Sequence, residues 1–196
     1  RSVVRPSLNA RESALAASPN SDALTGACAS GGFLWTVTQD AIWRRDRDEN
    51  WQARSLAVDG QPMSFVNCVL APGETDAWVG TDDGLRVLVD WPADRWVLFH
   101  GDRASSTGRI VMVEAGKTRM GREARGPIPA GSVTSLAFAD GLAWVGTNNG
   151  LFRCVMKSAD YLSTPSLSFK KKTASNAGSA KDNGLSAQIP QGHHGI

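Results

Sequence analysis

The sequence has few cysteines and histidines and no long apolar run. Its three cysteines, Cys28, Cys68 and Cys154, lack CxxC spacing, and an odd number leaves no closed set of disulfides. We expect small residues buried in strands, which weakly favours a reducing intracellular compartment, cytoplasm or organelle. No apolar run approaches the roughly 18 residues of a membrane helix, and no signal-peptide core is visible, so no membrane insertion is expected of this chain.

An excess of one charge is also lacking. Lys and Arg number 21 against 19 Asp and Glu, a formal net charge of +2, so no whole-chain field favours nucleic acid. Basic residues nevertheless gather around residues 109–125 and in a run of three lysines. We interpret these first as solvated loops, and second as contacts to an acidic protein partner or to RNA. The partner-binding candidates in these segments are Arg109, Lys117, Arg119, Arg122, Lys170, Lys171 and Lys172.

An internal repeat is the dominant signal. Residues 78–85, Trp-Val-Gly-Thr-Asp-Asp-Gly-Leu, recur as residues 144–151 with only the two aspartates changed to asparagine, and a degraded copy occupies residues 35–42. An aromatic residue follows the tryptophan of each copy after 16, 18 and 17 residues, at Trp51, Trp96 and Tyr161. Each unit predicts four short strands, with a type I′ hairpin at the Asp-Gly or Asn-Gly turn between the second and the third.

Four-stranded units at a period near 43 residues are typical of β-propeller blades. Trp35 and Trp78 are 43 residues apart, whereas Trp78 and Trp144 are 66 apart. The excess falls at about residues 104–129, where an extra strand at 109–114 predicts a hairpin or long loop at the rim of the blade.

We therefore predict an all-β fold, a partial or incomplete ring of four-stranded antiparallel propeller blades with irregular N- and C-terminal extensions. An arm at 1–23 precedes three blades at 24–162, and a low-complexity tail follows at 163–196. Three blades do not close a ring, so we expect further blades from the same polypeptide. The alternative sources are a partner or irregular segments of this sequence that the repeat pattern does not reveal.

The repeat resembles a known family. The block Trp-Val-Gly-Thr-x-x-Gly-Leu, followed by the aromatic strand at 96–100, is similar to the propeller repeat of the two-component-regulator family. The first copy departs from it, because Val37 and Ala41 stand where the second has Gly80 and Gly84. Residues 182–186, Asp-Asn-Gly-Leu-Ser, resemble the segment that opens the next blade in that family. The resemblance thus implies that the tail leads into a further blade, and it implies ligand sensing by a signal-transduction receptor.

Candidate chemistry is sparse. Residues 115–118 end in the Gly-Lys-Thr of a phosphate-binding loop, but Val111 replaces the required first glycine and no helix pattern follows. His193 and His194 lie in a glycine-flanked tail and His100 is isolated, so surface positions are expected and not a metal site. The carboxylates at 82–83 are expected to be turn residues, because asparagines replace them in the other copy. We predict no catalytic residue, no cofactor and no metal.

Tryptophans are frequent, seven in all. Trp35, Trp78 and Trp144 share one repeat position, so burial between blades is the simplest interpretation. Trp91 lies beside Pro92 in a turn, and we expect it to be partly exposed and available to a partner.

These patterns favour a non-catalytic β-propeller module that binds other protein subunits of a larger assembly. The loops, the insertion and the tails would make the contacts, as a protein-binding scaffold or structural subunit. The alternative is the ligand-sensing propeller domain of a signal-transduction receptor, and the second alternative is a propeller enzyme. No small-molecule ligand is predicted.

Overall fold

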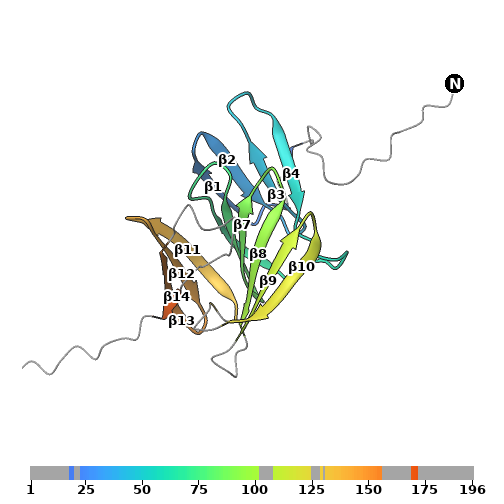
Figure 1. Cartoon of the computed structure of the whole chain (residues 1–196). Helices are drawn as coiled ribbons and strands as arrows, with labels where there is room; N and C mark the ends of the chain where they lie inside the picture. The colour runs from blue at the N-terminus through green and yellow to red at the C-terminus, as the bar shows by residue number, and fades with distance from the viewer. Residues whose placement is uncertain are drawn as a thin grey trace, which may run out of the picture.

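The computed structural model describes residues 18–19, 23–101, 108–124, 129, 131–155 and 169–171. Within these residues the chain forms three antiparallel sheets and no α-helix (Figure 1). The all-β class is therefore confirmed. The sheets are separate, and none of them closes on itself in the described part of the chain. Most of the N-terminal arm, Tyr161, residues 182–186 and the two tail histidines lie outside the described residues.

Each sheet follows one copy of the repeat in order along the chain. The first sheet contains β1 (Gly26–Ser30), β2 (Phe33–Val37), β3 (Ala41–Arg45) and β4 (Trp51–Ser55). The central sheet contains β5 (Val66–Leu70), β6 (Ala77–Thr81), β7 (Gly84–Asp90), β8 (Arg95–Gly101), β9 (Gly108–Glu114) and β10 (Lys117–Glu123). The third sheet contains β11 (Val133–Ala139), β12 (Leu142–Thr147), β13 (Gly150–Val155) and β14 (Phe169–Lys171).

One strand of the insertion matches the sequence-based expectation, and the fourth strand of the third sheet differs from it. The extra strand expected at 109–114 is β9, and together with β10 it extends the central sheet to six strands. The fourth strand of the third sheet is β14, which lies within the segment expected to be a low-complexity tail. Sequence pattern misses β14 because three residues, Phe-Lys-Lys, are too short to show an alternation.

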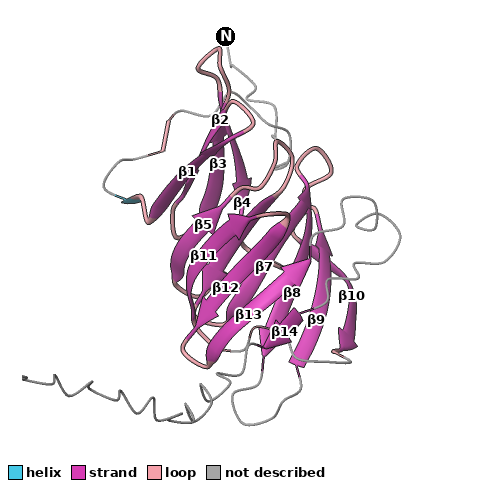
Figure 2. Ribbon diagram, turned by 90° about the vertical axis from the view of Figure 1, so that its left-hand side faces the viewer, coloured by secondary structure: helices cyan, strands magenta, loops and turns pink. Residues whose placement is uncertain are grey.

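The sheets stack with their first strands side by side. β5 lies beside β1 of the first sheet and beside β11 of the third (Figure 2). The central sheet is therefore covered on both faces, and alternate residues of each strand belong to two different cores. Val79 and Leu88 pack toward the first sheet, whereas Trp78 and Val87 pack toward the third. Double burial explains why β6 and β7 are almost continuously apolar.

The repeated tryptophan lies on the same face of each sheet, the face turned toward the next sheet in the chain. Trp35 packs on the central sheet and Trp78 on the third, and both are 0% exposed. Ala143 and Val145 pack on the central sheet, so Trp144 between them lies on the outer face of the third sheet, where it is half-buried. Burial between sheets is thus confirmed for Trp35 and Trp78, whereas the same expectation is wrong for Trp144.

The hairpin between β6 and β7 is not the type I′ turn that the sequence predicts. Its two loop residues, Asp82 and Asp83, have no positive φ, and the left-handed region is used instead by Gly84, at φ 135°. A Cβ at this glycine would collide with the carbonyl oxygen of Phe99. The Thr81 hydroxyl donates a hydrogen bond of 3.0 Å to the Gly84 carbonyl and thereby closes the loop.

The same closure recurs in the other two sheets. Thr147 Oγ1 donates to the carbonyl of Gly150 at 3.0 Å, and Thr38 Oγ1 donates to that of Ala41 at 3.2 Å. The first sheet thus keeps its hairpin although the glycine is absent. The repeated threonine, and not the glycine, is common to all three turns.

Gly80 sets the distance between the central and third sheets. A Cβ at this position would lie 2.5 Å from the sulfur of Cys68 and 2.6 Å from Cγ1 of Val133. Because Val133 opens β11, the missing side chain allows the third sheet to approach β6 closely.

We predict that Gly80→Ala lowers the free energy of unfolding by about 1–3 kcal/mol, because the methyl group overpacks the contact with Val133. Urea denaturation followed by tryptophan fluorescence measures the change. Gly26→Ala is the matched control, since its Cβ would meet nothing closer than 3.4 Å and its φ is ordinary. Equal effects of the two substitutions would contradict the steric explanation.

Candidate protein-binding site

The basic candidates at 109–122 lie on strands and not in solvated loops. Arg109 is on β9, and Lys117, Arg119 and Arg122 are on β10, the outermost strand of the central sheet. All four side chains are exposed, as is every residue of β10. The structure therefore collects these residues near one sheet edge, where, within the described part of the chain, no further strand pairs with β10 and the Thr118 amide donates to Asp59.

The Gly-Lys-Thr segment is part of this hairpin and does not form a phosphate loop. Ala115 and Gly116 connect β9 to β10 and have φ values of 53° and 69°. Positive φ at both central residues is the geometry of a type I′ turn. Lys117 and Thr118 are then the first residues of β10.

The tip of the hairpin is fastened to the loop that follows the first sheet. Asp59 accepts hydrogen bonds from the Thr118 hydroxyl at 2.6 Å and from the Thr118 amide at 3.2 Å. The Asp59 amide in turn donates to the Gly116 carbonyl at 2.8 Å. The Thr118 side chain, followed by its amide, lowers the pKa of the Asp59 carboxyl. The hairpin is therefore held at its turn as well as along β8.

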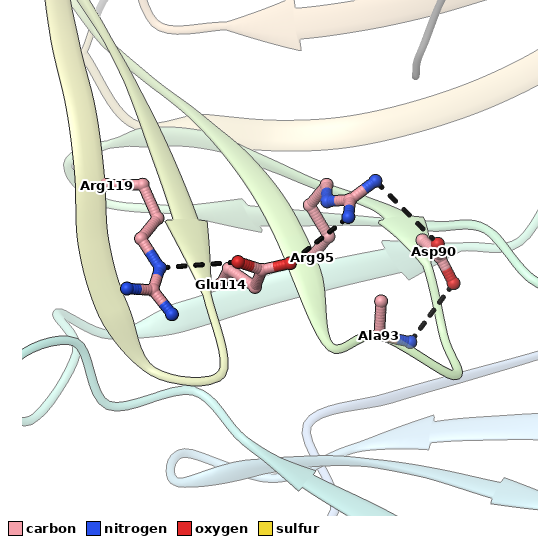
Figure 3. Close-up of polar contacts among 5 residues, drawn as sticks. All are labelled: Asp90, Ala93, Arg95, Glu114 and Arg119. Carbon is pink, nitrogen blue, oxygen red and sulfur yellow. Dashed lines mark hydrogen bonds and ion pairs between the residues drawn. The ribbon is translucent and has the colours of Figure 1, made fainter. Parts of the chain in front are cut away.

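A chain of alternating charges crosses the base of the hairpin turn (Figure 3). Glu114 accepts from Arg119 Nε at 3.3 Å and from an Arg95 amino group at 3.1 Å. Arg95 also lies 3.9 Å from Asp90, which accepts the Ala93 amide at 3.1 Å. The hydrogen bond from Arg95 is the main cause that lowers the pKa of Glu114. Exposed ion pairs add little stability, so this chain chiefly fixes where the guanidinium groups point.

A groove of about 250 Å³ opens beside these charges. It is lined by Arg95, Met112, Val113, Glu114 and Arg119. Small-molecule sites are usually larger, about 300–1,000 Å³, and mostly apolar. Apolar residues between charged walls suit one side chain of a protein partner better than an enclosed ligand.

Arg95, Glu114, Asp90 and Asp59 were not among the residues predicted to form a site. Arg95 and Glu114 are directly opposite each other on β8 and β9, and that register is visible only once the insertion is known to pair with β8. The signal in the sequence that could have indicated this ion pair is the opposite charge of the residue that opens β8 and the residue that ends β9.

Trp91 is a core residue, so its expected exposure is wrong. The side chain is 2% exposed, and the guanidinium carbons of Arg44 and Arg54 lie 4.7 Å and 4.9 Å from the ring centre. Its edge meets Trp35 at 5.2 Å and 88°, and its Nε1 donates to Gln52 at 3.0 Å. Trp91 packs with residues of the first sheet although Pro92 beside it is exposed, and local sequence does not reveal this packing.

The remaining candidates are less informative. Lys170 is exposed on β14, Lys171 is on the same strand, and Lys172 lies outside the described residues. His100 is half-buried at the end of β8, and burial lowers its pKa, with Arg86 adding to that effect. In the described part of the chain no three His, Cys, Asp or Glu side chains are grouped to hold a metal ion.

The cysteines are free thiols on β1, β5 and β13. Burial raises the pKa of Cys68 to about 11 and that of Cys154 to about 12. Burial also raises the pKa of Cys28. Thiols of this kind are poor nucleophiles at neutral pH.

Comparison with known proteins finds similarity only among solved structures. No protein-family model and no curated protein matches the sequence. The extracellular domains of two hybrid two-component systems from B. thetaiotaomicron, BT3049 and BT4673, are similar to this chain at 12% and 16% identity. The matches cover 77% and 82% of this chain but 24% of each neighbour, so the chain spans about a quarter of their length. Their TM-score is 0.32, so the fold is argued from the sheets themselves.

Both neighbours are extracellular, which contradicts the reducing intracellular compartment expected from the cysteines. That expectation is wrong because it rested on cysteine number alone. Thiols buried among strands are protected by packing, and so they do not report the redox state outside the protein. Among the residues that the structure describes, no helix has the length and apolar character of a membrane span.

We predict that Trp91→Ala lowers the free energy of unfolding by about 3–5 kcal/mol, because it removes a buried ring that joins the first and central sheets. Chemical denaturation checks this. Pro92→Ala, a change at the exposed neighbour, is the control and is expected to stay within about 0.5 kcal/mol. An unchanged stability of Trp91→Ala would contradict the burial of this ring and favour a surface position.

A second prediction concerns pH. Because the pKa of Asp59 is lowered in the folded chain, its hydrogen bonds to Thr118 are fully present above the ordinary value of 3.8 and are lost only as the pH falls through the lower folded value. The Thr118 amide resonance is expected to titrate with a midpoint below 3.8. Asp59→Asn should abolish the transition. A midpoint above 3.8 would contradict the hydrogen bonds.

Proposed function

We propose that the chain forms three consecutive blades of a β-propeller and acts as a non-catalytic protein-binding scaffold. The single observation that carries the binding role is the β9–β10 hairpin, an exposed charged sheet edge that Asp59 and Glu114 hold in place. The propeller interpretation is supported by the stacking of β1, β5 and β11 and by the equivalent position of the repeated tryptophans.

The hairpin suits a protein partner for two physical reasons. An unpaired strand edge offers backbone donors and acceptors to an added strand. Charged side chains on such an edge also prevent indiscriminate pairing, so a partner must complement them. Lys117, Arg119 and Arg122 favour an acidic segment, because attraction between opposite charges selects the partner and speeds the encounter.

The second candidate function is ligand sensing in a signal-transduction receptor. Its support is the similarity of residues 78–85 and 144–151 to the repeat of the two-component-regulator family. The neighbours from B. thetaiotaomicron belong to two-component systems, but a TM-score of 0.32 does not decide between the two candidates. A sensing propeller would bind a small ligand, whereas the scaffold binds protein.

Charge reversal on the hairpin tests the proposal. We predict that Lys117→Glu with Arg119→Glu weakens capture of specific partners from a source extract by at least about tenfold, since two attractive contacts become repulsive. Cross-linking with quantitative mass spectrometry measures the capture. The control is Arg45→Glu with Arg47→Glu, which changes the net charge equally and likewise breaks one arginine–glutamate bridge, Arg45–Glu49 at 2.7 Å.

Partners lost equally in both variants would argue against a role for the hairpin. Absence of any hairpin-dependent partner, together with thermal stabilisation by a soluble small ligand, would favour the sensor instead.

A further inference from the structure

We infer that the outer face of the third sheet binds the outer face of the first sheet in a second copy of this chain, head to tail. The inference rests on the stacked-blade architecture proposed above. Its starting point is that the two internal interfaces, first to central and central to third, are built from the same repeat positions. At those positions on the two outer faces, Leu24, Asn148 and Leu151 are exposed and Trp144 is half-buried.

The side of each internal interface that comes first in the chain carries a tryptophan and a branched aliphatic residue. Trp35 and Ile42 fill these positions against the central sheet, and Trp78 and Leu85 fill them against the third. All four are at most 1% exposed. In the third sheet the equivalents are Trp144, which is half-buried, and Leu151, which is 37% exposed.

The other side of each interface contributes a branched residue at the start of its first strand. Val66 opens β5 and packs in the core shared with the first sheet, and Val133 opens β11 and packs in the core shared with the central sheet. The residue in this place before β1 is Leu24, and it is 42% exposed. Leu24 thus occupies the position of two buried valines but is itself exposed.

A polar contact from the β-hairpin loop reinforces each internal interface. Gln39, in the loop before β3, accepts the Val66 amide at 3.0 Å and donates to its carbonyl at 3.3 Å. Asp82, at the equivalent place before β7, accepts the Ser132 hydroxyl at 2.9 Å. Asn148 occupies the same place before β13 and its side chain is exposed. An amide at this position can donate and accept, as Gln39 does toward a strand backbone.

One chain therefore carries both halves of an interface that it already forms twice internally. A second copy satisfies both halves at once: Leu24 of each copy lies against Trp144 and Leu151 of the other, and Asn148 reaches the backbone that precedes β1. Such a contact is heterologous, and it leaves no exposed half only if it closes into a ring. Two copies, each with the three sheets of the described residues, give a ring of six, within the four to eight blades that propellers use.

Analytical ultracentrifugation and native mass spectrometry of the whole chain test this inference. The wild type is expected to be a dimer, and Leu24→Asp or Leu151→Asp alone should raise the dissociation constant at least about tenfold, since each places a carboxylate in an apolar contact. Phe65→Asp is the control, because Phe65 is 70% exposed but occupies none of the equivalent positions. Circular dichroism verifies that each variant is folded.

Mixing the two variants gives the sharper result. In a head-to-tail dimer of Leu24→Asp with Leu151→Asp, both substitutions fall in one interface and the other interface is wild type, so the mixture should form heterodimers that neither variant forms alone. A symmetric dimer built on one patch would not show this rescue. A monomeric wild type, substitutions without effect or a mixture without heterodimers would each overturn the inference.

The hairpin variant Lys117→Glu with Arg119→Glu separates this inference from the proposed function. It should dimerise normally and lose partner capture. A monomeric chain whose partners still depend on the hairpin would refute the dimer and leave the scaffold function standing. A dimer whose partners do not depend on the hairpin would refute the scaffold function alone.

Discussion

The close approach of neighbouring sheets is the constraint on which the rest of the structure depends. Gly80 makes this approach possible between the central and third sheets, because a Cβ there would lie 2.6 Å from Cγ1 of Val133. In the central sheet Gly80 is paired with Cys68, and in the third sheet Gly146 is paired with Ser135. The first sheet reverses the arrangement, since Val37 on β2 is paired with Gly26 on β1. The degraded copy of the repeat thus has its glycine on the partner strand, where a Cβ would meet nothing closer than 3.4 Å.

This reversal explains why the repeat tolerates its departures. A side chain at position 37 fills the space that a glycine leaves at position 26, so the volume between the strands is conserved although the motif is not. The turn shows the same principle, because Thr38 closes the loop between β2 and β3 although Ala41 stands in the place of Gly84. What the three copies share is a steric and hydrogen-bonding requirement, and the Trp-Val-Gly-Thr block is one of its solutions.

Repeated local patterns made the strands predictable, whereas contacts between distant segments were not. The order of the strands follows from the repeat except for β14 of the third sheet, and the extra strand β9 follows from its own apolar run. The burial of Trp91 depends on Arg44, Arg54 and Gln52, which lie 37 to 47 residues earlier in the sequence. The ion pair of Arg95 with Glu114 likewise depends on a register across 19 residues. Neither the burial of Trp91 nor the ion pair of Arg95 with Glu114 can be read from the sequence of a single strand, because only the packed sheets bring these residues together.

The molecule separates its two kinds of exposed surface. The rim of the central sheet is an edge strand whose exposed charged groups remain hydrated, while the two outer sheet faces present apolar groups at positions that are buried elsewhere in the same chain. Contacts at the rim should weaken with added salt, because they depend on charge. Contacts at the faces should not, because they depend on removing apolar area from water. The response of binding to salt therefore distinguishes which of the two surfaces a partner occupies, even when that partner has not been identified.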